Sequence, residues 1–184
     1  MERMITNVLV GLTGTEYSNA VVNAAVDVAK PHQASLLAVT AVNMRALRNV
    51  GPVPPGAGEA ARELREYRIK LSQESMDAAI KYFEEQCTAA GLEHHVKQEQ
   101  RDEPFDFLIS RSRYHDLTLL SLTSIFEYNI RSTRDADPSV TICRLISEGV
   151  RPILAVPLEY RPVKRVFAAY SGSIESAATL RRFM

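Results

Sequence analysis

The stretch Asn7–Ala20 reads NVLVGLTGTEYSNA and indicates the fold more directly than any other part of the chain. It begins with the apolar run Val8–Val10, which has the length and composition of a short strand and is closed by Gly11. After the turn Thr13-Gly14-Thr15, apolar side chains recur at alternating spacings of four and three residues, at Tyr17, Val21, Ala24 and Val28. This spacing places them on one side of a helix. The N-terminal region is therefore predicted to be a strand, a tight turn and a helix.

The same alternation of strand and helix continues to residue 157. Further strands, three of them apolar and one polar and edge-like, are predicted at residues 36–42, 95–99, 117–122 and 152–157. Pro31 is expected to end the first helix, and further helices are predicted over residues 59–90, 104–113 and 138–149. Strands that alternate with helices pair in parallel through right-handed crossovers. The predicted fold class is α/β, a doubly wound open five-stranded parallel sheet with helices on both faces.

Two of these helices carry an apolar stripe that predicts which side faces the core. In the long helix the stripe consists of Ile69, Met76, Ile80, Phe83, Cys87 and Ala90. In the last helix before residue 150 it consists of Val140, Cys143 and Ile146. Neither cysteine belongs to a CxxC motif or a Cys/His cluster, so both are interpreted as reduced core residues.

Charge and hydropathy exclude several classes of partner. Lysine plus arginine equal aspartate plus glutamate at 22 each, so no net basic charge draws the chain to nucleic acid or to an anionic membrane. No apolar run approaches the roughly 18 residues of a membrane span, and the first residues lack a signal-peptide pattern. We expect a cytoplasmic protein with no nucleic acid and no membrane among its partners.

Residues 165–178 repeat the pattern of residues 7–20 at a shift of 158 residues. RVFAAYSGSIESAA lies over NVLVGLTGTEYSNA, so that a strand, a hydroxyl-Gly-hydroxyl turn and a helix start coincide, with Gly172 over Gly14. We predict one domain at residues 1–158. Residues 159–184 are predicted to be a linker plus the first strand and helix of a truncated second copy.

Three regions together resemble a known family. Val8–Thr15 with Ser18 stands where that family has a strand, an Asp-Gly-Ser turn and a serine, and His115–Leu120 resembles its Asp-Leu-Ile-Val-Met run. Ser139–Pro157 looks like its closing helix and strand. On these residues the chain resembles the universal stress protein family across residues 4–157, and residues 163–184 look like the opening of a tandem second copy. The resemblance implies the adenine nucleotide alpha hydrolase-like fold and a part in the stress response.

The phosphate loop of the resembled family is altered in this chain. Family members that bind ATP carry Gly-x-x-Gly, nine residues and then Gly-Ser or Gly-Thr, whose backbone amides close around a triphosphate. Here Ser121-Leu122-Thr123-Ser124 replaces the first pair, thirteen residues follow, and Pro138-Ser139 replaces the last pair, which removes one amide donor. Thr13, and Ser171 in the second copy, stand where the family has an aspartate that contacts the nucleotide. We expect a degenerate ATP-binding motif and no cofactor, with ATP kept as the weaker alternative.

The first functional hypothesis is a non-enzymatic stress-response module that acts through association. The fifth predicted strand supplies an apolar sheet edge, which consists of Ile153, Leu154, Ala155 and Val156. Open sheet edges of this kind pair with partner strands. In the resembled family this strand typically forms the dimer contact, and in tandem members the second copy supplies its mate. The predicted partner is a second chain, bound through this edge or through residues 163–184, or a second domain of the same type.

The second hypothesis is a sensor of a nucleotide or another small ligand. Open α/β sheets bind ligands where the strand order reverses, here at the carboxyl ends of the first and fourth strands. The predicted lining of this crevice is Gly11, Leu12, Thr13, Gly14, Val42, Ser121, Ser124 and Ser139. An empty crevice blocked by Phe126 or Tyr128 is the alternative.

The third hypothesis, an enzyme of the wider nucleotide-binding superfamily, has the least support. A hydrolase needs a nucleophile beside a base, and no such order surrounds the four histidines, His32, His94, His95 and His115. Adjacent residues on a strand point to opposite faces, so His94 and His95 cannot share one metal ion. No catalytic residue and no metal ligand is predicted.

Overall fold

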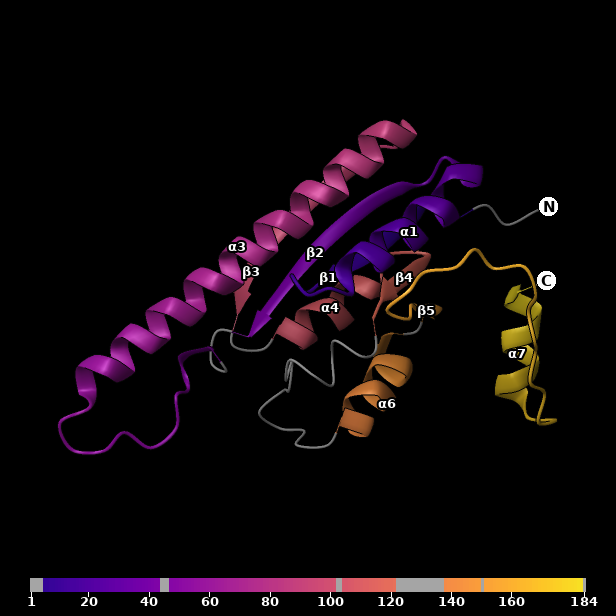
Figure 1. The fold of residues 1–184 in the computed structure, drawn as a ribbon. Helices are drawn as coiled ribbons and strands as arrows, with labels where there is room; N and C mark the ends of the chain where they lie inside the picture. The colour runs from indigo at the N-terminus through magenta and orange to yellow at the C-terminus, as the bar shows by residue number, and fades with distance from the viewer. Residues whose placement is uncertain (1–4, 44–46, 102–103, 122–137, 150, 184) are drawn as a thin grey trace.

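Five parallel strands form one sheet in the order β3-β2-β1-β4-β5 (Figure 1). The structure is a computed structural model, and it describes residues 5–43, 47–101, 104–121, 138–149 and 151–183. The strands are β1 Asn7–Leu12, β2 Ser35–Asn43, β3 His94–Arg101, β4 Leu117–Leu120 and β5 Ile153–Ala155. The helices are α1 Ser18–His32, α3 Gly58–Ala90, α4 Pro104–Ser112, α6 Pro138–Gly149 and α7 Ile174–Phe183. The predicted fold class, including the polar edge strand β3, is confirmed.

The strand β1 lies at the centre of the sheet. Its residue Val8 is in register with Leu36 of β2 on one side and with Leu117 of β4 on the other. The chain first adds β2 and β3 on one side of β1 and then adds β4 and β5 on the opposite side. The strand order therefore reverses between β1 and β4, which is where the sequence places the crevice.

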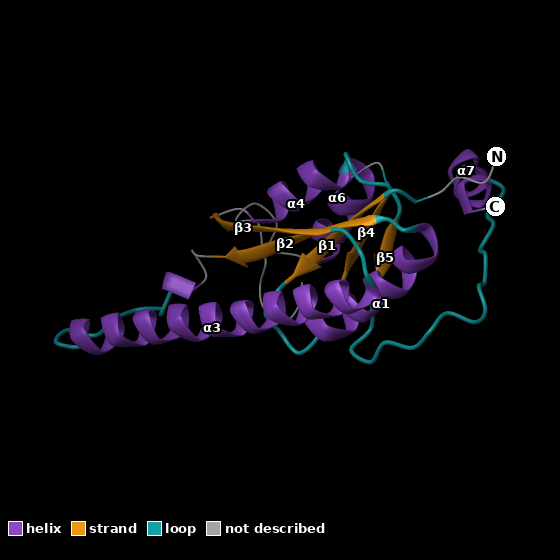
Figure 2. Cartoon of the chain, turned by 90° about the horizontal axis from the view of Figure 1, so that it is seen from above, coloured by secondary structure: helices purple, strands orange, loops and turns teal. Residues whose placement is uncertain are grey.

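Helices cover both faces of the sheet. Figure 2 shows α1 and α3 along one face and α4 and α6 along the other. One core cluster joins α1 and α3 to the sheet and includes Val22, Phe83 and Leu119, and a second includes Leu9, Phe107 and Leu145. Burial of both faces explains why β1 and β4 are mainly apolar on both sides rather than alternating between apolar and polar residues.

The long helix α3 is buried only over its C-terminal half. Its buried residues are Met76, Ala79, Ile80, Phe83 and Cys87, all from the stripe predicted to face the core or next to it. Gly91 has a φ of +67° and its N–H bonds the carbonyls of Cys87 and Thr88, which ends the helix where the sequence predicts. The N-terminal half of α3 extends past the sheet (Figures 1 and 2).

Two expectations about the helices are wrong. Pro31 lies inside the last turn of α1, which ends at His32, and Gln33 with a φ of 51° supplies the stop. In α6 the predicted inward stripe is out of phase, because Leu145 is buried whereas Cys143 and Ile146 are exposed. Cys143 is therefore a surface thiol and not a core residue.

The chain turns back across the domain after β5. The hydroxyl of Tyr160 donates a 2.7 Å hydrogen bond to Oδ2 of Asp27 in α1. Residues 161–173 then form no helix or strand, so the strand predicted near Arg165–Tyr170 is not formed there, since no described strand lies beside it to complete its hydrogen bonds. The helix α7 follows and stands apart from the sheet in both views. Across the described part of the chain, no helix is both long and apolar enough to span a membrane.

Candidate functional site

The turn between β1 and α1 forms one wall of the predicted crevice. Leu12, the last residue of β1, is fully buried, and Thr13 follows it half-buried. The hydroxyl oxygens of Thr13 and Thr15 lie 2.9 Å apart and share a hydrogen bond across the turn. Between them Gly14 has a φ of +67°, a conformation that L side chains rarely adopt. The hydroxyl-Gly-hydroxyl pattern thus forms a tight turn that is held by its own side chains.

The same turn is pressed against the backbone of α3. A Cβ at Gly14 would lie 3.1 Å from the backbone nitrogen of Met76 and 3.3 Å from the carbonyl carbon of Ser75. Backbone atoms cannot rotate away as a flexible side chain can. Gly14 is therefore required both for its φ and for the approach of α3, a contact that the sequence did not indicate.

The first residue of α1 carries a buried hydroxyl. Ser18 is 2% exposed, and its Oγ has no hydrogen-bond partner among the described residues. The N-cap residue Tyr17 makes no side-chain capping bond to the first turn of the helix. The first-turn N–H groups of a helix attract negative charge, and the unpaired hydroxyl lies at the same end.

The strands beside β1 complete this end of the sheet. Gly11 lies next to β4, since a Cβ there would be 3.5 Å from Cβ of Leu120, and the buried Ser121 follows directly. Leu12 is in register with Thr40 of β2, so Val42 extends the strand two residues farther in the same direction. The structure therefore brings Gly11 through Gly14, Ser121 and the backbone of Val42 to one end of the sheet.

Two predicted lining residues are less well defined. Ser139 is the second residue of α6, and only its backbone is described. Ser124 lies outside the described residues, as do Phe126 and Tyr128. The prediction omitted Ser18, Ser75 and Met76. The sequence shows only that Ser18 follows the glycine turn at the start of a predicted helix. The approach of α3 leaves no local signal.

The described lining offers hydroxyls and backbone amides rather than titratable groups. Such donors can bind an anion, but they supply neither a general base nor an acid. Groups with shifted pKa values lie elsewhere: burial raises the pKa of Cys87 to about 12 in the core, and Asp116, whose pKa is lowered by hydrogen bonds from Thr6 and Asn7, lies at the opposite end of β4. Within the described ranges no three metal-ligating side chains cluster.

The outer edge of β5 is a second candidate site. Thr118 N donates to the Pro152 carbonyl at 3.1 Å and Val156 N donates to the Leu120 carbonyl at 2.9 Å. Because backbone groups alternate in direction along a strand, the N–H groups of Ile153 and Ala155 point away from β4.

The four predicted edge residues differ in exposure. Ala155 is exposed, Ile153 and Leu154 are half-buried, and the side chain of Val156 is buried in the core. At this edge the backbone N–H groups are therefore more available to a partner than the side chains are. The segment that follows exposes large apolar side chains, namely those of Leu158, Val163, Val166, Phe167 and Tyr170.

Comparisons with known proteins agree on one family. A family model described as the universal stress protein family matches residues 4–106. A solved universal stress protein from Lactobacillus plantarum is 16% identical, with a TM-score of 0.50, over 85% of this chain and 100% of that one. Another, from Archaeoglobus fulgidus, is 11% identical, with a TM-score of 0.50, over 84% of this chain and 95% of that one. At such identities the structural likeness establishes the fold alone. No curated protein matches the sequence.

Proposed function

Because this chain belongs to the universal stress protein family, we propose that it is a non-enzymatic stress-response module that associates with a second copy through the open edge of β5. The observation that carries the proposal is the pair of outward N–H groups on Ile153 and Ala155, which have no strand beside them among the described residues. Unpaired backbone groups at a sheet edge are satisfied by a strand of another chain.

The segment after β5 supports association. Phe167 is 93% exposed, and Val163, Val166 and Tyr170 are also exposed. Large apolar side chains gathered in one exposed segment mark a surface that gains free energy when a partner covers it. The hydrogen bond from Tyr160 to Asp27 holds the start of this segment against α1.

A role without catalysis is supported by the chemistry of the described lining. The crevice brings together neutral hydroxyls and amides, and the sequence replaces each glycine of the family's ATP loop. A protein of this kind would transmit a stress signal by the partner it binds rather than by a reaction.

The experiment is a sedimentation comparison of the wild type with Ala155→Pro at micromolar concentrations. Proline removes the outward N–H of residue 155 and leaves the bonds from Thr118 N and Val156 N intact. Ala155→Ser is the matched control, since it keeps the N–H. We expect Ala155→Pro alone to reduce association. A wild type that stays monomeric, or equal association in both variants, would refute the β5 contact.

A second candidate function is a small-ligand sensor that uses the crevice. The observation in its favour is Ser18, whose buried Oγ has no partner in the described part of the chain and lies at the N-terminus of α1. Burying a hydroxyl without a partner costs free energy, and this cost is offset when a ligand accepts a hydrogen bond from the hydroxyl. The ligand would be an anion, such as a nucleotide bound in a different pose from the one that the family's Gly-x-x-Gly phosphate loop holds.

This candidate is tested by purifying the protein without added nucleotide, denaturing it and identifying released small molecules by mass spectrometry. Calorimetry with Ser18→Ala follows, because this variant removes the unpaired hydroxyl and leaves the α1 backbone unchanged. A nucleotide recovered near one per chain, with weaker rebinding to Ser18→Ala, would favour the sensor. No released molecule and no heat from a panel of nucleotides and inorganic anions would rule out the sensor and leave association.

A further inference from the structure

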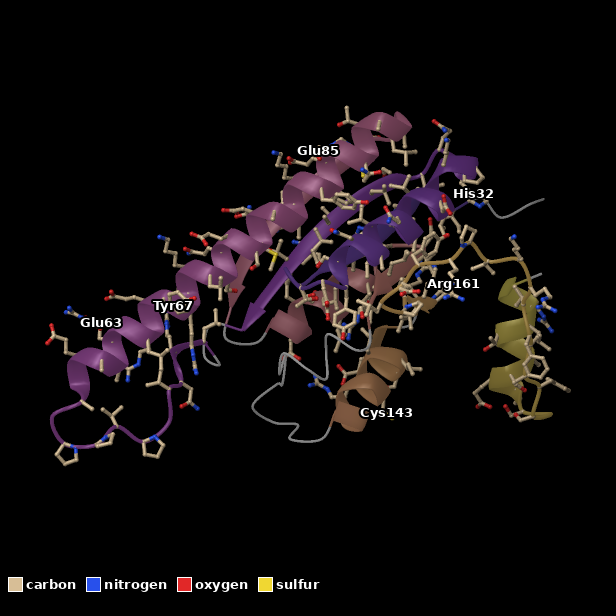
Figure 3. The ribbon with its side chains drawn as sticks, viewed as in Figure 1. His32, Glu63, Tyr67, Glu85, Cys143 and Arg161 are labelled. Carbon is tan, nitrogen blue, oxygen red and sulfur yellow. The ribbon has the colours of Figure 1, made fainter. Side chains whose placement is uncertain are left out.

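The projecting half of α3 carries a second apolar stripe that the domain itself does not cover. Leu64 is 42% exposed, Tyr67 63% and Leu71 50%, and Ala60 is exposed on the same side. These four residues, named here the outer stripe, recur at spacings of four, three and four. At about 100° per residue they lie on the side of the helix away from Ile80 and Phe83, which face the core. Figure 3 shows Tyr67 and its neighbour Glu63 on the part of α3 beyond the sheet.

The spacing of the outer stripe is that of a coiled-coil seam, in which positions a and d alternate by three and four residues. Leu64 and Leu71 take position a, and Ala60 and Tyr67 take position d. We infer that the outer stripe packs antiparallel against the outer stripe of a second copy of this chain. This contact goes beyond the β5 association and uses a different surface.

One antiparallel register matches large side chains with small ones. Leu64 faces the partner's Tyr67 in two central layers, and Ala60 faces the partner's Leu71 in two outer layers. A shift by one heptad places Leu64 opposite Glu74 in one direction and moves Leu71 past the start of the helix in the other. The stated register therefore buries all four apolar residues of both helices and no charge in the seam.

The charges beside the stripe favour the same register. Position g holds Glu63 and Lys70, and antiparallel helices bring g residues together, so each Glu63 faces the partner's Lys70. Lys70 already lies 3.8 Å from Glu74, but both side chains are mostly exposed, so this pair is weak and compatible with a second carboxylate. The result is two symmetric ion pairs.

The start of α3 supplies a third match. Its N-cap residue, Ala57, makes no side-chain capping bond, so the first N–H groups lack a side-chain acceptor from it. The antiparallel register places the partner's Glu74 opposite Ala57. A carboxylate near a helix N-terminus is favourable, so Glu74, which would disrupt the seam opposite Leu64, is stabilising opposite Ala57.

A parallel arrangement matches the charges less well. Position g of one helix then faces position e of the next heptad, which pairs Glu63 with Arg68 but Lys70 with the neutral Ser75. Arg68 also donates a 3.2 Å hydrogen bond to the carbonyl of Asn49, in the loop that precedes α3. The antiparallel arrangement uses both g positions and leaves this bond in place.

The first test measures the mass of the full chain by sedimentation in the Ala155→Pro background, which leaves the outer stripe intact and separates this contact from the β5 edge. We expect a dimer of twice the 20.5 kDa chain mass. Adding Leu64→Glu with Leu71→Glu should yield a monomer with an unchanged circular dichroism spectrum, because both side chains are exposed within one chain. Gln73→Glu with Thr88→Glu adds the same charge outside the outer stripe and should leave the dimer intact.

The second test exchanges charges in the same background. Glu63→Lys alone and Lys70→Glu alone should each weaken the dimer about tenfold, and the two together should restore it. A parallel pair predicts no rescue, since Glu63→Lys would then place a second positive charge opposite Arg68. A monomeric Ala155→Pro protein, a dimer that survives Leu64→Glu with Leu71→Glu, or a double exchange as weak as the single ones would overturn the inference. A wild type that associates while Ala155→Pro is monomeric would overturn this contact and leave the β5 proposal standing.

Discussion

The backbone nitrogen of Met76 lies 3.1 Å from the point where a Cβ on Gly14 would be. This approach joins the β1–α1 turn to α3 across 62 residues of sequence, and Gly14 meets it with a φ of +67°. The turn and the buried half of α3 are therefore one packed unit at the end of the sheet where the crevice is proposed.

Gly14→Ala should lower the free energy of unfolding by about 3 kcal/mol, through the left-handed backbone and the contact with α3. Gly11→Ala is the matched control, because its Cβ would meet Leu120 at an ordinary 3.5 Å. We expect that variant to stay within about 1 kcal/mol of the wild type. Urea unfolding curves measure both, and equal losses would show that Gly14 is not specially required.

Thr118→Val should raise the free energy of unfolding by about 1 kcal/mol. Thr118 is fully buried in β4, and its Oγ1 has no hydrogen-bond partner among the described residues. Valine keeps the shape and removes the hydroxyl. Thr118→Ser keeps the hydroxyl and removes the methyl group, so it should be destabilising. A loss of stability in Thr118→Val would show that the hydroxyl does have a partner.

Asp116→Asn should lower the free energy of unfolding by about 1 kcal/mol at neutral pH. Partial burial alone would raise the pKa of Asp116, but hydrogen bonds from the Thr6 N–H and hydroxyl, from Asn7 N–H, and the charge of Arg151 lower it. Its Oδ2 lies 2.7 Å from the hydroxyl of Thr6. A lowered folded-state pKa contributes stability above the unfolded value of 3.8, and this is lost as the pH falls through the folded value.

The difference between wild type and Asp116→Asn should therefore shrink in acid unfolding curves taken below pH 3.8. Glu84→Gln, on the exposed side of α3, should follow the wild type throughout. A constant difference from neutral pH down to strong acid would contradict the role assigned to Asp116.

Tyr160 should titrate far above an ordinary tyrosine. Burial, the hydrogen bond to Asp27 and the Asp27 charge raise the pKa of Tyr160 to about 12. A raised pKa contributes stability that is complete below the unfolded value of 10.0 and is lost as the pH rises through the folded value. Ultraviolet titration should show its late phase move to lower pH in Asp27→Asn, which keeps an acceptor and removes the charge. An unmoved phase would mean that Tyr160 does not contact Asp27 in solution.

The two cysteines should differ in reactivity. Cys143 is exposed, whereas Cys87 is buried and burial raises its pKa to about 12, so little thiolate is available. An aromatic disulfide reagent should modify one thiol in the folded protein and both after denaturation. Cys143→Ser should abolish the fast phase, and a fast phase that remains would place Cys87 at the surface.

Much of the site could be predicted because its parts are local in sequence. Gly14 and its flanking threonines indicate a tight turn, and Ser121 follows an apolar run that is typical of a buried strand. The contact of Gly14 with Ser75 and Met76 could not be predicted, because nothing near Gly14 in the sequence shows which helix lies against it. The outer stripe was missed for a related reason: Leu64 and Leu71 lie on the side of α3 away from the core stripe, and nothing in the sequence shows whether another element covers that side.

The order and type of the elements from β1 to β5 follow from the amino-acid sequence alone, since apolar period and glycine or proline punctuation are properties of neighbouring residues. Which side of α6 faces inward was settled by the packing of the folded chain, which places Leu145 in the core and Cys143 outside. The same packing joined Tyr160 to Asp27 and Gly14 to Met76. Such contacts depend on how the helices and the sheet pack together. An apolar pattern shows that a helix buries one face, but it does not show which element that face contacts.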